Sequence, residues 1–337
     1  MKEAMFYEKG EDQKVKCHLC NHNCLIPSGK RGLWGVRENR EGVLCALTYG
    51  SAIARNIDPI EKKPLFHFYP GSRSYSIAAV GCNFRCDFCQ NYEISQMPKE
   101  GGPILGEPFP PEDVVAAAKR SRCASIAYTY TEPTIFFEYA YETAKLAQGE
   151  GIKNVFVSNG YMGKEALETA RPWLHAANID LKAFTERFYK KTCSARLKPV
   201  LDNLKTIKNM GIWLEITTLI IPTLNDSDNE LGEIADFIKT ELGPETPWHV
   251  SRFHPTFRLT DIGPTSVQTI MRAQEIGKKA GLYYVYTGNI AGQGGESTNC
   301  YRCGALLIER LGFSVLQNNI TNGTCPSCHA EIHGAGL

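Results

Sequence analysis

The chain has 337 residues, and its 37 basic side chains nearly balance 36 acidic ones, for a net charge of +1 at pH 7. These numbers exclude a protein that binds nucleic acid or membranes through a global electrostatic field, while leaving room for a local patch. The charged N-terminus does not resemble a secretory signal, and no apolar run approaches the roughly 18 residues that a membrane helix requires. We therefore expect a cytoplasmic protein without membrane contact.

The chain contains 13 cysteines, an odd and large number for a cytoplasmic protein. In a reducing compartment such a number indicates metal sites rather than disulfides. Cys123 and Cys193 stand alone, and we expect both to be small buried apolar side chains. The others form an N-terminal, a central and a C-terminal group.

The N-terminal group is contained in CHLCNHNC, residues 17–24, and is followed by Cys45. Cys17, Cys20 and Cys24 supply three thiolates, and either His22 or Cys45 could complete a set of four. The favoured hypothesis is a structural zinc site. The alternative is a second iron–sulfur cluster that feeds electrons to a first one.

Between residues 74 and 288, apolar runs alternate with helical patterns. The pattern predicts strands at 74–80, 124–130, 154–159, 177–182, 213–221, 248–253 and 282–287, and helices at 110–121, 133–151, 163–171, 198–210, 227–242 and 265–280. Alternating strands and helices favour a parallel sheet of right-handed βαβ units. Because no GxGxxG turn follows the first strand, a partial barrel of about six (βα) units is expected, with its chemistry at the C-terminal strand ends.

The central group is contained in GCNFRCDFCQN, residues 81–91, directly after the first predicted strand. Cys82, Cys86 and Cys89 follow the spacing C-x3-C-x2-C. Three thiolates hold three irons of a 4Fe–4S cluster and leave the fourth iron open for a small molecule. A structural zinc site is the alternative, but it usually needs a fourth ligand nearby.

The C-terminal group consists of CYRC, residues 300–303, and CPSC, residues 325–328. Two such knuckles at this separation predict a zinc ribbon with the ligands Cys300, Cys303, Cys325 and Cys328. A rubredoxin-like iron site is the alternative, because four thiolates in a tetrahedron suit both metals.

The central cysteine spacing, with Phe88 before the third cysteine, resembles the signature of the radical S-adenosylmethionine (SAM) enzymes. The resemblance implies that the amino and carboxylate groups of SAM bind the open iron. TYTEPT, with Thr131 and Glu132, is similar to the GGE-type motif that meets the SAM amino group, although both glycines are absent. In VSNG, Ser158 and Asn159 are expected to donate hydrogen bonds to SAM, with a plain turn as the alternative.

Two later strand ends add to this resemblance. DLK, with Asp180 and Lys182, resembles a segment at the SAM site of pyruvate formate-lyase activating enzymes. SRFHP places His254 near a histidine of the same enzymes. A solvated acid–lysine pair and a structural histidine are the respective alternatives.

The combination of motifs resembles the radical SAM enzyme of the AmmeMemoRadiSam system across nearly the whole chain. The segments that carry this resemblance are CHLCNHNC with GVREN, IEKKPLFHF (60–68), GCNFRCDFCQN, TYTEPT, DLKAF, YVYTGNI (284–290) and the CYRC…CPSC tail. That family usually has a fourth N-terminal cysteine where this chain has Trp34. Memo-like and AMMECR-like proteins are the partners that the resemblance implies.

The resemblance implies a partial (βα)6-type radical SAM barrel at 61–292, between a Cys-rich module at 1–60 and a zinc ribbon at 293–337. Its cofactors are a 4Fe–4S cluster, SAM and zinc. A flavodoxin or ferredoxin supplies one electron, SAM is cleaved reductively, and the 5′-deoxyadenosyl radical takes hydrogen from a protein, RNA or small-molecule substrate. Activation of a glycyl-radical enzyme is one alternative. The other is a non-catalytic zinc protein that binds nucleic acid.

Overall fold

The computed structural model describes residues 2–100, 102–290 and 294–337. The chain divides into two compact units, one of residues 1–58 and 73–175 and the other of residues 59–72 and 176–337. The predicted division into a Cys-rich module, a core and a ribbon stays a prediction, because the boundaries of the two units do not coincide with the boundaries of those three parts.

The first unit contains a parallel sheet that follows the predicted pattern closely. β11 pairs in parallel with β9 on one side and β12 on the other. Helices α2 and α3 pack against these strands. The bounds are β8 Ala54–Pro59, β9 Arg73–Ala78, α1 Tyr92–Gln96, α2 Pro111–Arg120, β11 Ser125–Tyr128, η4 Pro133–Phe136, α3 Phe137–Gly149, β12 Lys153–Ser158 and α4 Lys164–Ala170.

Helix α2 illustrates why the sequence pattern predicts these elements well. Pro111 occupies the first turn, where a missing N–H costs nothing, together with two acidic side chains, and basic side chains occupy the last turn. The buried face consists of Pro111, Val114, Val115, Ala117 and Ala118. The residues at the helix ends and the apolar face therefore both favour a helix over this segment.

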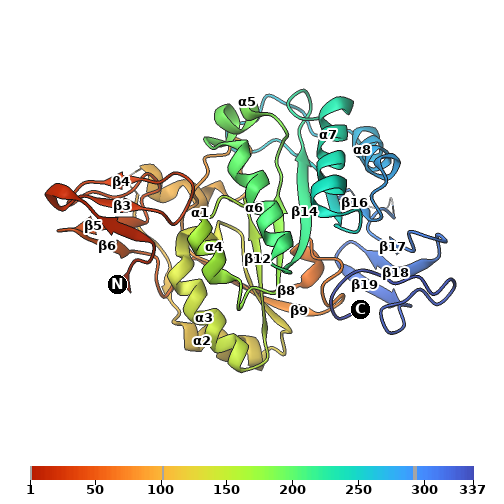
Figure 1. Ribbon diagram of the computed structural model, residues 1–337, viewed down its shortest axis with the longest axis horizontal. Helices are drawn as coiled ribbons and strands as arrows, with labels where there is room; N and C mark the ends of the chain where they lie inside the picture. The colour runs from red at the N-terminus through yellow and green to blue at the C-terminus, as the bar shows by residue number, and fades with distance from the viewer. Residues whose placement is uncertain (1, 101, 291–293) are drawn as a thin grey trace. The chain divides into compact units, whose positions relative to one another are not determined.

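The N-terminal part of the first unit consists of short antiparallel strands (Figure 1, red). Consecutive strands here are too close along the chain for βα units, so β2–β3, β3–β4 and β5–β6 pair as hairpins, whereas the pairs β1–β6 and β7–β10 join strands that are far apart in the sequence. Two three-stranded sheets have the orders β1–β6–β5 and β2–β3–β4, and β7 pairs with β10. The bounds are β1 Lys2–Glu3, β2 Tyr7–Lys9, β3 Val15–Cys17, β4 Leu25–Ile26, β5 Arg37–Arg40, β6 Val43–Ala46, β7 Ser51–Ala52 and β10 Glu107–Pro108.

The second unit contains four parallel strands, in which β14 pairs with β13 and β15, and β15 pairs with β16. Helix α6 packs on β14, and α8 packs on β15 and β16. No helix of the described residues is both long and apolar enough to span a bilayer. The bounds are β13 Ala176–Asp180, α5 Glu186–Phe188, α6 Leu197–Asn209, β14 Trp213–Ile220, α7 Asp228–Phe237, β15 Trp248–Arg252, α8 Val267–Ala280 and β16 Val285–Gly288.

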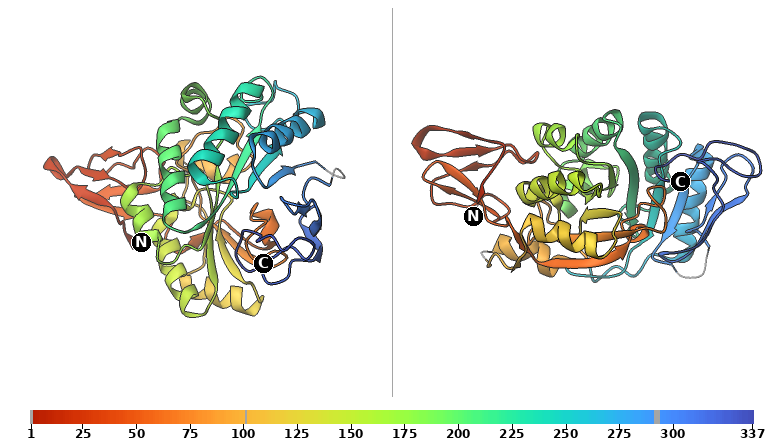
Figure 2. Two further views of the ribbon diagram at one scale, coloured as in Figure 1. Left: turned by 45° about the vertical axis from the view of Figure 1, so that its right-hand side comes forward. Right: turned by 90° about the horizontal axis from the view of Figure 1, so that it is seen from below.

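The C-terminal ribbon forms its own antiparallel sheet of three strands in the second unit (Figure 2, blue). β18 pairs with β17 and with β19. Arg310, from β18, donates hydrogen bonds to the carbonyl of Phe66 and the hydroxyl of Thr298. The bounds are β17 Thr298–Asn299, β18 Leu306–Leu311 and β19 Ser314–Asn318.

A buried carboxylate connects the segment 59–72 to the strands of the second unit. Glu215, in β14, is fully buried and accepts hydrogen bonds from the N–H groups of Phe66 and His67, from Trp213 Nε1 and from His249 Nε2. Burial raises the pKa of Glu215, but the hydrogen bond and charge of His249, the charge of His67 and the hydrogen bond from Trp213 together outweigh it, so the pKa lies below the ordinary value. The ionised carboxylate therefore satisfies four donors, of which only Trp213 belongs to a partly exposed residue.

We expect Glu215→Gln to lower the free energy of unfolding by roughly 3 kcal/mol, because the amide turns one acceptor into a donor that faces other donors. Urea unfolding monitored by circular dichroism measures the change. Glu275→Gln is the matched control, because Glu275 is exposed and forms an ion pair with Lys279 within α8; it should leave the free energy of unfolding almost unchanged. Equal losses in the two variants would contradict the role assigned to Glu215.

Candidate functional site

The three central cysteines lie on the loop between β9 and α1 in the first unit. Cys86 is buried, whereas Cys82 and Cys89 are partly exposed. The N–H of Phe84 lies 3.3 Å from Cys82 Sγ, and the Ser95 hydroxyl lies 3.2 Å from Cys89 Sγ. Burial raises the pKa of the Cys82 thiol to about 12, so metal binding there must displace a proton.

The carboxylate of Glu132 joins the ends of two neighbouring strands. Glu132 follows β11 and is only 1% exposed. It accepts hydrogen bonds from Ser158 Oγ and Asn159 N, both at 2.8 Å, and from the N–H and hydroxyl of Thr134. Burial raises its pKa, and these donors oppose the rise. Glu132 therefore fixes the SNG turn after β12.

The fixed turn extends to the cysteine loop through Asn159. Its side-chain Nδ2 donates to Asn83 Oδ1 at 2.6 Å and lies 3.9 Å from Cys82 Sγ. Thr131 donates its hydroxyl hydrogen bond to the carbonyl of Ala79, on the same loop. The structure thus brings the predicted residues of the TYTEPT and VSNG segments together beside Cys82. Their contacts with SAM stay predictions.

Lys99 adds a positive charge to this site. Its Nζ lies 4.7 Å from the centre of the Trp34 ring and donates to the carbonyl of Phe84. Burial lowers the pKa of Lys99, while attraction to the thiolate forms of Cys82, Cys86 and Cys89 opposes that shift. The cysteines lose their protons when they bind a metal. The Lys99 cation compensates part of the resulting negative charge of the three thiolates. Phe88, between the second and third cysteines, is 4% exposed and packs inward.

The remaining predicted SAM residues belong to the second unit. Asp180 ends β13 and forms an ion pair with Lys182 at 2.8 Å. Lys182 is mostly buried, with 13% of its side chain exposed, whereas 36% of the Asp180 side chain is exposed. His254 lies just beyond β15 and is exposed. Their roles toward SAM stay predictions.

The four C-terminal cysteines converge on one point. Their sulfurs all lie within 4.8 Å of one another, and among the described residues they form the one group of this kind. Cys300 Sγ lies 3.6 Å from Cys328 Sγ, and Cys303 Sγ lies 3.7 Å from Cys325 Sγ. A tetrahedral ion with metal–sulfur bonds of about 2.3 Å needs sulfurs about 3.8 Å apart. The group therefore fits one tetrahedral metal ion.

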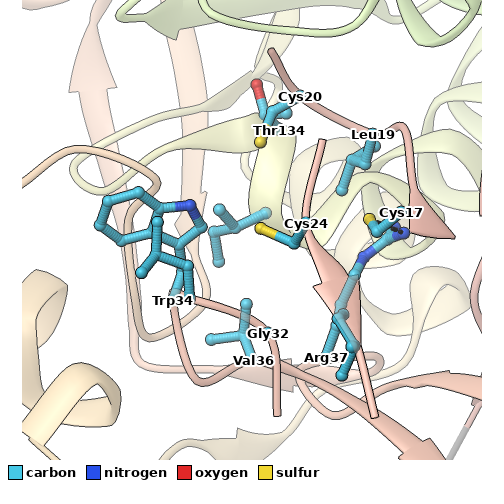
Figure 3. Close-up of a pocket in the computed structure, with 12 residues that line it drawn as sticks. Cys17, Leu19, Cys20, Cys24, Gly32, Trp34, Val36, Arg37 and Thr134 are labelled. Carbon is cyan, nitrogen blue, oxygen red and sulfur yellow. Dashed lines mark hydrogen bonds between the residues drawn. The ribbon is translucent and has the colours of Figure 1, made fainter. Parts of the chain in front are cut away.

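The N-terminal cysteines line a cavity of about 30 Å³ in the first unit (Figure 3). Cys17, Cys20 and Cys24 all border it, and Trp34 and Arg37 lie on opposite sides of it. Neither His22 nor Cys45, the two expected fourth ligands, borders the cavity. His22 Nε2 instead lies 2.9 Å from the carbonyl oxygen of Asn83, and Cys45 is in β6.

Sequence analysis missed three side chains that shape these sites. Asn83 and Lys99 had no signal, because an asparagine inside a cysteine loop and a lysine ten residues beyond the last cysteine are ordinary surface residues in sequence. Arg37 forms a buried ion pair with Glu138, in α3. Arg37 is the first residue of β5, and nothing in the sequence around it indicates a partner about a hundred residues away.

We expect Glu132→Gln to destabilise the first unit by about 2 kcal/mol, because the amide NH2 replaces one of the two accepting oxygens. In the place of Oε2 it loses the hydrogen bond from the N–H of Asn159, and in the place of Oε1 it loses those from Ser158 and Thr134. Thermal unfolding followed by circular dichroism reports the loss. Glu150→Gln serves as the control, since Glu150 forms an exposed pair with Lys119; little change is expected there. An unaltered melting temperature in Glu132→Gln would show that the turn holds without the carboxylate.

Comparison with known proteins agrees with this geometry. The model of the radical SAM superfamily matches residues 76–238. Uncharacterized protein MJ0808 of Methanocaldococcus jannaschii is 48% identical over 334 residues, which cover 98% of this chain and 99% of that protein. A putative glycyl-radical enzyme activating enzyme of the same organism, MJ1632, is 25% identical over 212 residues, or 62% of this chain and 78% of that protein.

Among solved structures, a radical SAM methyltransferase from Sphaerobacter thermophilus has a similar fold, with a TM-score of 0.52 and 18% identity over 71% of each chain. The mixed α/β fold class with a parallel sheet is thereby confirmed. The narrower resemblance to AmmeMemoRadiSam enzymes stays a prediction. The chain carries a radical SAM superfamily domain, is related to activating enzymes, and belongs to the same family as MJ0808.

Proposed function

We propose that this protein is an enzyme that cleaves SAM reductively at a 4Fe–4S cluster held by Cys82, Cys86 and Cys89. The observation that carries the proposal is the linkage of the cysteine loop to the ends of β11 and β12 through Asn83, Asn159 and Glu132. A structural metal loop would not need strand-end polar groups gathered beside one of its thiols. Membership of a radical SAM family supports the same function.

The donor set fits the proposed cluster. Three thiols are present without a fourth, as one open iron requires. Because each thiolate of a cubane binds a different iron, the three sulfurs are not expected to converge as those of the C-terminal group do. Asn83 Nδ2 is buried without a hydrogen-bond partner, so a donor is available to an acceptor at this site. Lys99 offsets negative charge.

When bound, the cluster and SAM supply an electron transfer that breaks the C5′–S bond and yields methionine and a 5′-deoxyadenosyl radical, which takes hydrogen from a substrate. The residues of the chain hold the cluster and orient the loops around it. Glu132 keeps Ser158 and Asn159 in place, and Asn159 in turn holds the cysteine loop by its Asn83 side chain. A flavodoxin or ferredoxin is the electron donor in this proposal.

The test is anaerobic purification, cluster reconstitution and incubation with SAM and dithionite. We expect 5′-deoxyadenosine and methionine from the wild type and none from Cys86→Ala, which lacks one of the three thiolates. Cys123→Ala is the matched control, because Cys123 is a buried cysteine of the same unit outside all three groups; its turnover should equal that of the wild type. Wild-type protein that contains iron but forms no 5′-deoxyadenosine would reject the proposal.

We further propose that the metal of the C-terminal group is zinc. Closed sets of four thiolates with this sulfur spacing are typical of structural zinc, which contributes folding energy to a small module. The ribbon has a small core of its own, formed by Cys300, Leu307, Ile308, Cys325, Ala330 and Ile332. Two of these six residues are ligands, so the core depends on the metal.

Cys325→Ser should remove about one zinc per chain and leave the iron content unchanged, because the two sites share no ligand. Inductively coupled plasma mass spectrometry measures both metals. Cys193→Ser is the control, since Cys193 is a buried cysteine of the same unit outside the ribbon; its zinc content should match the wild type. Loss of iron in place of zinc from Cys325→Ser would assign iron to the ribbon.

A further inference from the structure

The cavity between Cys17, Cys20 and Cys24 has features that a bare packing defect would lack. Three thiols border it, and Arg37 Nη1 lies 3.6 Å from Cys17 Sγ. Arg37 is only 5% exposed and pairs with the equally buried Glu138. The Arg37 guanidinium therefore holds its charge partner on one side and reaches a cysteine sulfur on the other.

Two hydrogen-bond donors at this cavity have no acceptor. Trp34 is 8% exposed, and its Nε1–H is buried without a partner. The Nε–H of Arg37, on the opposite side of the cavity, is also buried without a partner. Native proteins leave few buried donors unpaired, and an unpaired donor often marks a missing ligand. Both groups donate, so the occupant must carry acceptor atoms.

The arrangement of the sulfurs distinguishes between possible metals. In the described part of the chain, the C-terminal cysteines are the one set of ligand atoms that lie within 4.8 Å of one another, so the three N-terminal sulfurs are spread more widely. A single zinc ion needs its thiolates about 3.8 Å apart, and it needs a fourth ligand. Neither His22 nor Cys45 borders the cavity to supply one. Wider thiols suit a cluster, in which each binds its own iron.

We propose that Cys17, Cys20 and Cys24 hold a second iron–sulfur cluster of the cubane type, with Trp34 Nε1–H donating a hydrogen bond to one of its sulfurs. The sulfides of such a cluster are the acceptors that the unpaired donors lack. Arg37 Nη1 donates a hydrogen bond to the sulfur of Cys17. Among the described residues that line the cavity there is no fourth cysteine and no histidine, so the fourth iron would take another ligand. This inference stands apart from SAM cleavage at the central cysteines.

The N-terminal cavity is built against the central site within the same unit. The His22 ring packs on Trp34 at 4.6 Å between ring centres and on Tyr161 at 4.8 Å, and its Nε2 lies against the backbone next to Cys82. The main chain of this segment also bonds the loop after β12, where the N–H of Gly163 donates to Leu19 O at 2.8 Å. A Cβ at Gly163 would lie 2.1 Å from His18 O. His22 therefore contacts Trp34 of the N-terminal cavity and the backbone of the central cysteine loop.

The test counts iron and sulfide after anaerobic reconstitution. The wild type should hold about eight irons and eight sulfides per chain, and Cys24→Ala and Cys86→Ala should each hold about half. Cys45→Ala is the matched control, because Cys45 lies outside the cavity; it should hold the full number. Mössbauer spectra of ⁵⁷Fe-loaded Cys86→Ala should show one cubane cluster, at the N-terminal cysteines. Cys24→Ala should keep only the cluster at the central cysteines.

About four irons in the wild type, all lost in Cys86→Ala, would overturn the second cluster and leave the proposed function intact. A second zinc per chain that disappears from Cys24→Ala would overturn it equally. Iron retained in Cys86→Ala together with no 5′-deoxyadenosine from the wild type would instead reject the proposed function alone. Should Cys24→Ala fail to fold, the wild-type iron count and the Cys86→Ala spectrum still decide.

Trp34→Phe tests the donor without removing a ligand or the ring. Because hydrogen bonds to cluster sulfurs raise the reduction potential, loss of the indole N–H should lower the potential of one cluster and leave the iron content unchanged. Redox titration of Cys86→Ala and of Cys86→Ala with Trp34→Phe isolates that cluster. Identical potentials in the two proteins would contradict the hydrogen bond from Trp34.

Discussion

The central site depends on the requirement that a buried carboxylate must have enough donors. Glu132 is almost completely buried and meets this requirement with the N–H of Asn159 and the hydroxyl of Ser158, which come from the next strand end. Because Asn159 is fixed in this way, its side chain can hold Asn83 beside Cys82. A single charge thus sets the relative positions of three loops, and a cofactor on those loops would bind in a preformed site.

The second unit uses the same principle at the opposite ends of its strands. Glu215 and His249 lie near the N-terminal ends of β14 and β15 and collect the backbone donors of the segment that contains Phe66 and His67. The buried charge at the N-terminal strand ends stabilises the fold. The C-terminal strand ends are the usual place for catalytic groups in (βα) architectures. Asp180 and Lys182 lie at those other ends.

The three cysteine groups differ in their surroundings more than in their sequence. The C-terminal sulfurs converge and satisfy one ion. The central thiols have a cation, Lys99, and an unpaired amide donor, Asn83 Nδ2, beside them. The N-terminal thiols lie beside two buried donors without acceptors, Arg37 Nε–H and Trp34 Nε1–H. Hydrogen-bond donors and positive charge beside thiols favour iron–sulfur clusters, because the sulfides of a cluster accept hydrogen bonds. A zinc ion with four thiolates has no sulfides that require such donors.

The sequence by itself determined the ligand types and the elements between residues 74 and 288, whereas the short strands β1 to β8 had no recognised pattern. Period-two and period-3.6 patterns, with caps such as Ser266 and Gly281 on α8, fixed strands and helices to within a few residues, because these signals act over one or two turns. The spacing of the central and C-terminal cysteines likewise indicated their metals locally. Only the tertiary structure decided that His22 faces Asn83 and that Arg37 pairs with Glu138. Those contacts join residues 61 and 101 positions apart, and they follow from how the chain packs, for which no local pattern exists.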